Sequence, residues 1–202
     1  MAAARVKNWI SGYGQGPLYA GTGTLTKVDG KHGLVLTAAH IFEGQVGPIT
    51  VEFPDGQVSG GRLLAIDPKL DVAALLIFAP RGIEPVPLAK EKPSVGDEVE
   101  IWGYGPKRFR SFLAQVSMPI AVEGDEPKAL VGAQGVQDKM VTIPGDSGGP
   151  MVQDGELVGV HWGYRGAETD PRRCIHAVGC DRIRDWLAKA LSAPFRGRLL
   201  GS

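Results

Sequence analysis

The sequence predicts an all-β fold, either a barrel or a sandwich, with one helix near its C-terminal end. Glycine and proline are dense among the 202 residues, 29 and 15 of them, and they interrupt many short apolar segments. Such segments are typical of strands in barrels and sandwiches. Asp-Gly pairs, which favour tight hairpin turns, separate several of the segments. They are Asp29-Gly30, Asp55-Gly56 and Asp154-Gly155.

Ten segments have the length and composition expected of strands. In chain order they are Gly23–Thr26, Leu34–Thr37, Ile49–Phe53, Arg62–Asp67, Val72–Phe78, Glu98–Gly103, Phe112–Pro119, Met151–Gln153, Leu157–Trp162 and Cys174–Val178. Apolar residues recur at helical spacing only once, near the end of the chain. They are Ile183, Trp186, Leu187, Ala190 and Leu191. Asp181 is a suitable N-cap, so a helix is expected over residues 181–192.

The chain is long enough for one substantial core or for two small ones joined edge to edge. Residues 84–93 are rich in proline and charge and lie near the middle, so they are a suitable connector between two halves of similar size. We expect a single functional unit over residues 1–202. Its oligomeric state does not follow from the sequence.

The charges are balanced, with 22 Lys and Arg against 22 Asp and Glu. Nothing in this balance favours a nucleic acid or an anionic membrane, so the expected partner is a peptide or a protein. No apolar run approaches the roughly 20 residues of a membrane-spanning helix. The start, Met1-Ala-Ala-Ala-Arg5, lacks the apolar core of a secretory signal. We therefore expect a soluble chain that is cytoplasmic unless a signal has been removed.

Cys174 and Cys180 are the two cysteines, too few for a disulfide framework. The segment between them has the pattern of a strand. Six extended steps of roughly 3.3 Å would hold the two sulfurs about 20 Å apart. Two free thiols are expected, unless a tight loop forms here.

The most informative segment is Pro-Gly-Asp-Ser-Gly-Gly-Pro at residues 144–150. Glycines on both sides of Ser147 leave its hydroxyl open to a substrate carbonyl. A suitable fold of the turn would point the N–H groups of Gly145 and Ser147 at one spot, where a developing oxyanion would sit. Taken alone, such a turn can also be an ordinary loop.

Two upstream residues favour a catalytic interpretation. His40 follows the apolar segment that begins at Leu34, and Asp71 stands directly before a second apolar run. A carboxylate at the mouth of a buried strand needs a hydrogen-bond donor, and an imidazole N–H supplies one. Asp67, four residues earlier, is the alternative carboxylate.

The ordered set Thr37-Ala-Ala-His40, Asp71 and Gly145-Asp-Ser-Gly-Gly-Pro150 resembles the chymotrypsin/trypsin family, whose triad has the chain order His, Asp, Ser. The resemblance extends from about Gly21 to the C-terminal helix. It implies two packed six-stranded antiparallel β-barrels, at about residues 10–86 and 95–180, with the helix at 181–192 after them.

The resemblance also implies an activity, that of a serine endopeptidase working through an acyl-enzyme. Ser147 would be the nucleophile and His40 its general base. Asp71 would orient the imidazole, because the family places its aspartate directly before such an apolar strand. The amides of Gly145 and Ser147 would form the oxyanion hole. The implied mechanism needs no metal and no organic cofactor.

The resemblance also implies the residues of the substrate pocket, which are identified by their number of positions before or after Ser147. Val141 stands where trypsin has the aspartate that pairs with Lys or Arg, so cleavage after basic residues is not expected. Thr142 would lie on the pocket wall. The segment His161-Trp162-Gly163 corresponds to the strand that binds substrate backbone along one pocket edge.

A histidine at position 161 together with Thr142 is similar to bacterial glutamyl endopeptidases, in which these residues bind the carboxylate of a substrate glutamate. Imidazole and hydroxyl donors in a dry pocket suit a carboxylate. We therefore predict cleavage after Glu or Asp. The alternative is that His161 caps the Asp71 network or packs behind the pocket.

Activation departs from the digestive and clotting members of the family, which begin with a freed Ile-Val-Gly-Gly terminus that pairs with the aspartate beside the serine. No such motif is present, so either Asp146 has another partner or activity is controlled in another way. The basic residues Lys107, Arg108 and Arg110 do not follow a phosphate-binding glycine pattern and are interpreted as a solvated hairpin.

Two other functions fit the sequence. One is a catalytically silent peptide-binding module on the same fold, although none of the three triad residues has been lost. The other is a self-processing protease domain of a viral or phage polyprotein, which would cleave its own junctions but not general substrates.

Overall fold

The computed structural model describes residues 1–9, 19–105, 108–117, 131–135, 142–165 and 174–191. The first half contains β1 (Ala3–Asn8), β2 (Tyr19–Asp29), β3 (His32–Thr37), the 3-10 helix η1 (Ala39–Phe42), β4 (Ile49–Glu52), β5 (Val58–Asp67) and β6 (Val72–Phe78). The second half contains β7 (Glu98–Gly103), β8 (Arg110–Ser117), β9 (Val131–Gly135), β10 (Pro150–Gln153), β11 (Glu156–Arg165), β12 (Cys174–Gly179) and the helix α1 (Cys180–Ala190).

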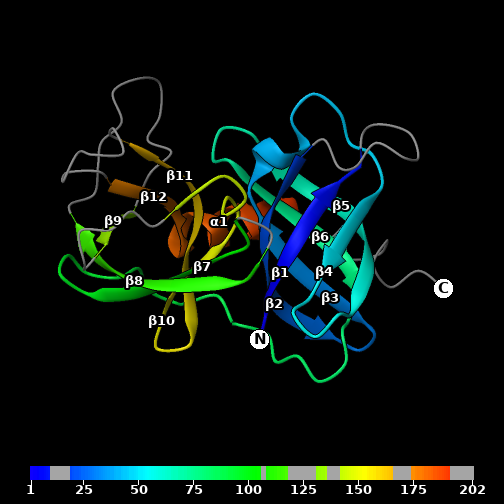
Figure 1. The fold of residues 1–202 in the computed structure, drawn as a ribbon, viewed down its shortest axis with the longest axis horizontal. Helices are drawn as coiled ribbons and strands as arrows, with labels where there is room; N and C mark the ends of the chain where they lie inside the picture. Colours follow the sequence, from blue (N-terminus) through cyan, green and yellow to red (C-terminus); the bar gives the residue numbers. More distant parts are fainter. Residues whose placement is uncertain (10–18, 106–107, 118–130, 136–141, 166–173, 192–202) are drawn as a thin grey trace.

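The strands form two closed antiparallel barrels, which lie side by side in Figure 1. The strand order is β1-β2-β3-β6-β5-β4 in the first barrel and β10-β11-β12-β9-β8-β7 in the second. Because both sheets close, each strand that the structure describes pairs with a neighbour on both sides. The expected fold, two six-stranded barrels followed by a helix, is confirmed.

Apolar side chains fill the barrels, from alternate positions in β7 and from a continuous run in β6. In β6 the run from Val72 to Leu75 is completely buried, and the facing strand β3 buries Val35 and Leu36. Full burial of each Val or Leu side chain contributes about 1.5–3 kcal/mol relative to leaving it in water. The interior of the second barrel contains Ile101 and Met151 among its fully buried residues.

The predicted connector contacts both barrels. The amide of Val86 donates to the carbonyl of Leu25 in the first barrel (2.9 Å). Pro87 and Ala89 lie beside Leu157 of the second barrel, with two backbone hydrogen bonds of 2.8 and 3.0 Å. Because these bonds follow one another along a short stretch, the connector ties the two barrels together as well as linking them covalently.

Two strands were not predicted. β1 lies before the expected start of the first barrel near residue 10, and its sequence Ala-Ala-Arg-Val-Lys-Asn has no long apolar run. It forms because it pairs with β2 on one side and β4 on the other. β9, Val-Gly-Ala-Gln-Gly, has the same weak local signal and is held between β8 and β12. Pairing partners distant in sequence decide both strands.

The helix begins one residue earlier than predicted, and its N-cap is Gly179 rather than Asp181. β12 runs directly into α1, so Asp181 falls in the first turn, where a carboxylate suits the positive end of the helix dipole. The helix ends at Ala190, and the last predicted position, 192, lies outside the described residues. No described helix is both long enough and apolar enough to cross a membrane.

Candidate active site

His40 lies in η1, the short helix that follows β3. Its imidazole Nδ1 is 2.8 Å from Oδ2 of Asp71, and its backbone amide donates to Oδ1 of the same carboxylate at 2.8 Å. The Asp71 side chain is 11% exposed and the His40 side chain 38% exposed. Both carboxylate oxygens therefore face His40, while part of the imidazole remains accessible from solvent.

Asp71 is the last residue of the turn between β5 and β6, and its φ of 57° lies in the left-handed region. This conformation is unusual for a residue other than glycine, although Asp tolerates it better than most. Asp67, the alternative carboxylate, begins the same turn. Its Oδ1 accepts the amides of Lys69 (2.9 Å) and Leu70 (3.0 Å). Asp67 thus shapes the turn, and Asp71 contacts the histidine.

Ser147 lies in the nucleophile loop, residues 143–149, which leads into β10. The amides of Asp146, Gly148 and Gly149 donate to backbone carbonyls at 3.0, 2.6 and 2.9 Å. Within the described part of the chain, the amides of Gly145 and Ser147 have no hydrogen-bond acceptor. These two N–H groups are the pair that the sequence predicts as an oxyanion hole.

The nucleophile loop lies against β2 of the first barrel. Thr22 of β2 donates its amide to the carbonyl of Ser147 at 2.8 Å. A Cβ added at Gly21 would lie 2.6 Å from that carbonyl oxygen and would also collide with Ile41, the neighbour of His40. Glycine at position 21 therefore lets the serine loop and the histidine helix approach one another closely.

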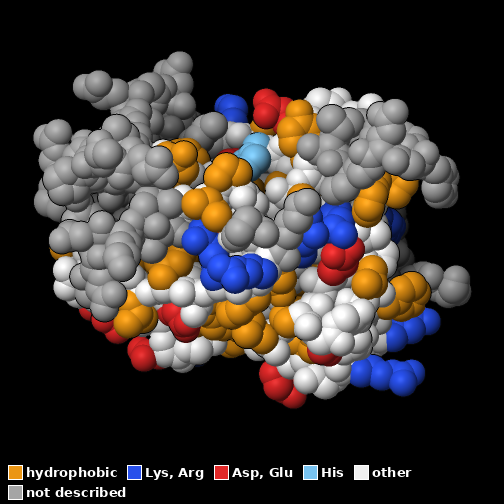
Figure 2. All heavy atoms as spheres, viewed as in Figure 1, with side chains coloured by type: hydrophobic (Ala, Val, Ile, Leu, Met, Phe, Trp, Pro, Cys, Tyr) orange, Lys and Arg blue, Asp and Glu red, His pale blue; other side chains and the backbone are white. Residues whose placement is uncertain are grey.

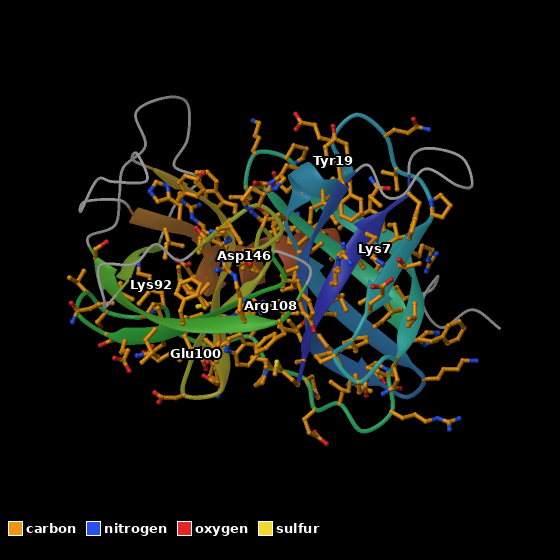
Figure 3. The ribbon with its side chains drawn as sticks, viewed as in Figure 1. Lys7, Tyr19, Lys92, Glu100, Arg108 and Asp146 are labelled. Carbon is orange, nitrogen blue, oxygen red and sulfur yellow. The ribbon has the colours of Figure 1, made fainter. Side chains whose placement is uncertain are left out.

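Asp146 is completely buried, and its carboxylate has several donors. Oδ1 accepts the amide of Gly105 and Oδ2 accepts the amide of Ile143, each at 2.9 Å. Arg110 adds an ion pair from its Nη2 to Oδ2 and a longer contact of 3.4 Å from Nε to Oδ1. Figure 3 places Asp146 close to the junction of the two barrels.

The interpretation of Arg110 as a solvated hairpin residue is wrong, because its side chain, 26% exposed, is paired with the carboxylate of Asp146. Arg108 is exposed, and Lys107 lies outside the described residues. The aspartate next to the serine, in a sequence with no Ile-Val-Gly-Gly motif, was the signal for a cation nearby. The sequence did not show which one. In Figure 2, Lys and Arg side chains gather near the junction of the barrels, with an exposed histidine above them.

Among the predicted pocket residues, His161 contacts the nucleophile loop directly. His161 of β11 exchanges backbone hydrogen bonds with Gly148 (2.6 Å) and Gly149 (2.8 Å), and its Nδ1 lies 3.3 Å from the carbonyl oxygen of Asp146. A carbonyl only accepts, so Nδ1 carries the proton in this arrangement. His161 Nε2 and the Thr142 hydroxyl are buried and have no hydrogen-bond partner among the described residues.

Burial lowers the pKa of His161 to about 4, since the charged imidazolium is disfavoured away from water. The imidazole is therefore neutral at pH 7. His161 is bonded to Asp146 rather than to the Asp71 network, so it does not cap that network.

Trp162 packs edge-on against the buried His176, with ring centroids 5.2 Å apart. Gly163 pairs with His176 across the ladder, and Val141 lies outside the described residues.

Other candidate groups lie away from this site. Cys180 is a free, buried thiol, and burial raises its pKa. The side chain of Cys174 lies outside what the structure describes. Among the described residues, no group of three or more His, Cys, Asp or Glu side chains is arranged to hold a metal ion.

Comparison with known proteins gives consistent matches. The trypsin-like peptidase domain matches residues 21–160. Trypsin 5G1 of Aedes aegypti is 29% identical over 187 residues, which cover 76% of this chain and 70% of that protein. A probable periplasmic serine endoprotease, DegP-like, of Chlamydia muridarum is 29% identical over 150 residues, covering 70% of this chain but only 27% of that longer protein. The crystal structure of the Rv3671c protease from M. tuberculosis, active form, has a TM-score of 0.72 at 24% identity and covers 94% of this chain and 80% of that chain.

Proposed function

The chain belongs to the trypsin-like peptidase domain family, and on that premise we propose that it is a serine endopeptidase with His40, Asp71 and Ser147 as its triad. The observation that carries the proposal is the double contact of Asp71 with His40, at 2.8 Å to the ring and 2.8 Å to the backbone amide. This contact fixes the orientation of the imidazole and the tautomer that leaves Nε2 as a base.

In the proposed reaction, His40 Nε2 takes the proton of Ser147 Oγ while the oxygen attacks the scissile carbonyl. The amides of Gly145 and Ser147 donate to the resulting oxyanion. The protonated imidazole then gives its proton to the leaving amine, so the peptide bond breaks and an acyl-enzyme remains. A water molecule, deprotonated by the same imidazole, attacks the ester and releases the acid product.

The activity is tested by hydrolysis of peptides by the wild-type chain and its variants. Ser147→Ala and His40→Ala are expected to lower kcat by at least about 10⁴-fold, because the triad acts as a unit. His32→Ala, at the start of the strand that leads to η1, is the matched control and should leave kcat unchanged. A wild-type rate equal to that of Ser147→Ala would instead favour a silent binding module.

We further propose that the pocket accepts Glu, or Asp, on the acyl side of the cut bond. Two buried polar groups support this specificity, the Thr142 hydroxyl and His161 Nε2, neither of which has a hydrogen-bond partner among the described residues. Leaving buried polar atoms unpaired is costly. A substrate carboxylate would accept from the Thr142 hydroxyl, and from His161 Nε2 once that nitrogen takes up a proton. The absence of an acidic residue at the predicted pocket position, Val141, speaks against cleavage after Lys or Arg.

Peptides that differ only in the residue before the cut bond test this preference. Glu should be cleaved at least about tenfold faster than the isosteric Gln, since each lost charged hydrogen bond costs about 1.5–3 kcal/mol. Thr142→Val should reduce the difference between Glu and Gln more than it changes the rate for Gln. Faster cleavage after Phe, Leu or Ala than after Glu would sink the proposed preference and leave the endopeptidase assignment untouched.

A further inference from the structure

We propose that Thr22, in the first barrel, is a positioning residue for the oxyanion hole of the second barrel. The proposal rests on the function proposed above and concerns how the nucleophile loop is held in its catalytic shape. Among the described residues, the Thr22 hydroxyl has no hydrogen bond to a residue of the proposed triad. It acts through the backbone of the loop that carries Ser147.

Thr22 lies in β2, is completely buried, and uses all its polar groups in long-range hydrogen bonds. Its amide donates to the carbonyl of Ser147 and its hydroxyl donates to the carbonyl of Gly145, each at 2.8 Å. The hydroxyl also accepts the amide of Tyr104 at 2.9 Å. One side chain thus joins β2 to two separate segments of the second barrel.

The two carbonyls held by Thr22 belong to the two residues whose amides would bind the oxyanion. Gly145 has a φ of 103°, a conformation from which glycine can rotate easily into others. This carbonyl belongs to the peptide that follows Gly145, so anchoring it holds one side of the residue and limits the rotations that would turn the Gly145 N–H away. The Ser147 amide belongs to the peptide whose carbonyl, that of Asp146, accepts the amide of Gly149 at 2.9 Å. The bond from Thr22 to Ser147 fixes the next peptide.

The hydrogen bonds of Thr22 also reach β3, the strand that leads to His40. The Thr37 hydroxyl donates to the carbonyl of Thr22 at 2.6 Å, and Thr37 stands three residues before His40. Gly148, at φ 86°, packs so closely here that an added Cβ would collide with the Thr22 carbonyl and the Thr37 hydroxyl. Thr22 therefore sets both the shape of the nucleophile loop and its distance from the element that carries His40.

Thr22→Val tests the proposal, because it removes the hydroxyl while nearly preserving side-chain volume. The expected result is a fall in kcat of about 10- to 100-fold with KM within about twofold, as for an interaction that matters only in the transition state. Affinity for a peptide aldehyde, whose adduct with Ser147 carries the oxyanion, should fall in parallel. Affinity for the corresponding cleaved peptide acid should not change. Thr22→Ser, which keeps the hydroxyl, should have nearly the wild-type kcat and aldehyde affinity.

Thr24 offers a matched control on the same strand. It is equally buried, and its hydroxyl has no hydrogen-bond partner among the described residues, so Thr24→Val should leave kcat and aldehyde affinity unchanged. Thr22→Ala, which adds no methyl group in place of the hydroxyl, repeats the test if Thr22→Val does not fold.

The proposal is overturned if Thr22→Val keeps the wild-type kcat, if aldehyde and product affinities fall together, or if Thr22→Ser loses as much kcat and aldehyde affinity as Thr22→Val. Failure of both Thr22→Val and Thr22→Ala to fold would also overturn it, since the hydroxyl would then serve barrel stability. A wild-type chain that hydrolyses no peptide would refute the proposed function itself, which distinguishes that failure from the failure of the Thr22 proposal.

Discussion

At the residue scale, the pairing of Asp146 with Arg110 holds the nucleophile loop from within the second barrel. The carboxylate is fully buried and receives the amides of Gly105 and Ile143 besides the guanidinium. In the digestive members of the family, a freed N-terminal amine neutralises the corresponding aspartate. Here a side chain of β8 supplies the positive charge, so this pairing does not depend on cleavage of the chain.

Arg110→Met is expected to destabilise the protein by about 3–5 kcal/mol and to reduce kcat, because it leaves a buried carboxylate without its counter-charge. Chemical unfolding and peptide hydrolysis measure the two effects. Arg108→Met, two residues earlier and exposed, is the control and should change neither. Adding Asp146→Asn to Arg110→Met should recover part of the stability. If the double variant were less stable than Arg110→Met, the role of Arg110 as the counter-charge of Asp146 would be contradicted.

A second prediction concerns His161. Its pKa of about 4 means that the ring is neutral at pH 7, and the proton on Nδ1 faces the carbonyl of Asp146. Nε2 can donate to a substrate carboxylate only after it takes up a proton. The bound carboxylate favours that proton, so binding of Glu should improve as the pH falls, whereas binding of Gln should not.

The measurement is the ratio of kcat/KM for Glu and Gln peptides between pH 8 and pH 5, because pH effects on the catalytic steps that both peptides share cancel in this ratio. We expect the ratio to rise as the pH falls. His161→Gln, which retains the backbone bonds to Gly148 and Gly149, should make the ratio independent of pH. A wild-type ratio that is constant or that falls over this range would exclude His161 as the carboxylate ligand.

At the element scale, the hairpin between β5 and β6 places the proposed catalytic carboxylate. Asp67 caps this turn through the amides of Lys69 and Leu70, and the turn ends at Asp71 in a left-handed conformation. A carboxylate oxygen that accepts neighbouring amides stabilises such turns locally. The cap therefore helps to keep Asp71 in a conformation that is otherwise unfavourable for it.

Asp67→Ala is expected to lower kcat by about tenfold without changing KM, because a looser turn misplaces Asp71 without touching the pocket. Asp67→Asn keeps an acceptor oxygen and should retain most of the activity. Asp55→Ala is the matched control: Asp55 accepts the amide of Gln57 at 3.1 Å in the turn at the opposite end of β5. Equal losses in Asp67→Ala and Asp55→Ala would show a general effect on the barrel instead.

The elements that the sequence predicted are those with strong local signals. β3, β6 and β10 to β12 have apolar or alternating runs, and the histidine and serine motifs adjoin them. The segments β1 and β9 have no such run, and long-range pairing forms them. β2 and β5 extend beyond the predicted Gly23–Thr26 and Arg62–Asp67 for the same reason, as polar and small residues continue each ladder.

At the scale of the whole molecule, the candidate site is assembled from both barrels. His40 and Asp71 come from the first and Ser147 from the second, and Thr22 and the connector near Val86 join the two bodies by hydrogen bonds. The order of the three proposed triad residues could be inferred from the chain. Thr22 and Arg110 could not, because their partners are 123 and 36 residues away and each residue type is common at the positions concerned.

The central claim is that Ser147 is a nucleophile activated by His40, and covalent modification tests it most directly. The measurement is the rate at which a fluorophosphonate adds to the intact chain, followed by mass spectrometry with the modified residue mapped. We expect one adduct, on Ser147, no adduct in Ser147→Ala, and a rate at least about 10³-fold lower in His40→Ala. No adduct on the folded wild-type chain, or an adduct on another residue that persists in Ser147→Ala, would contradict it.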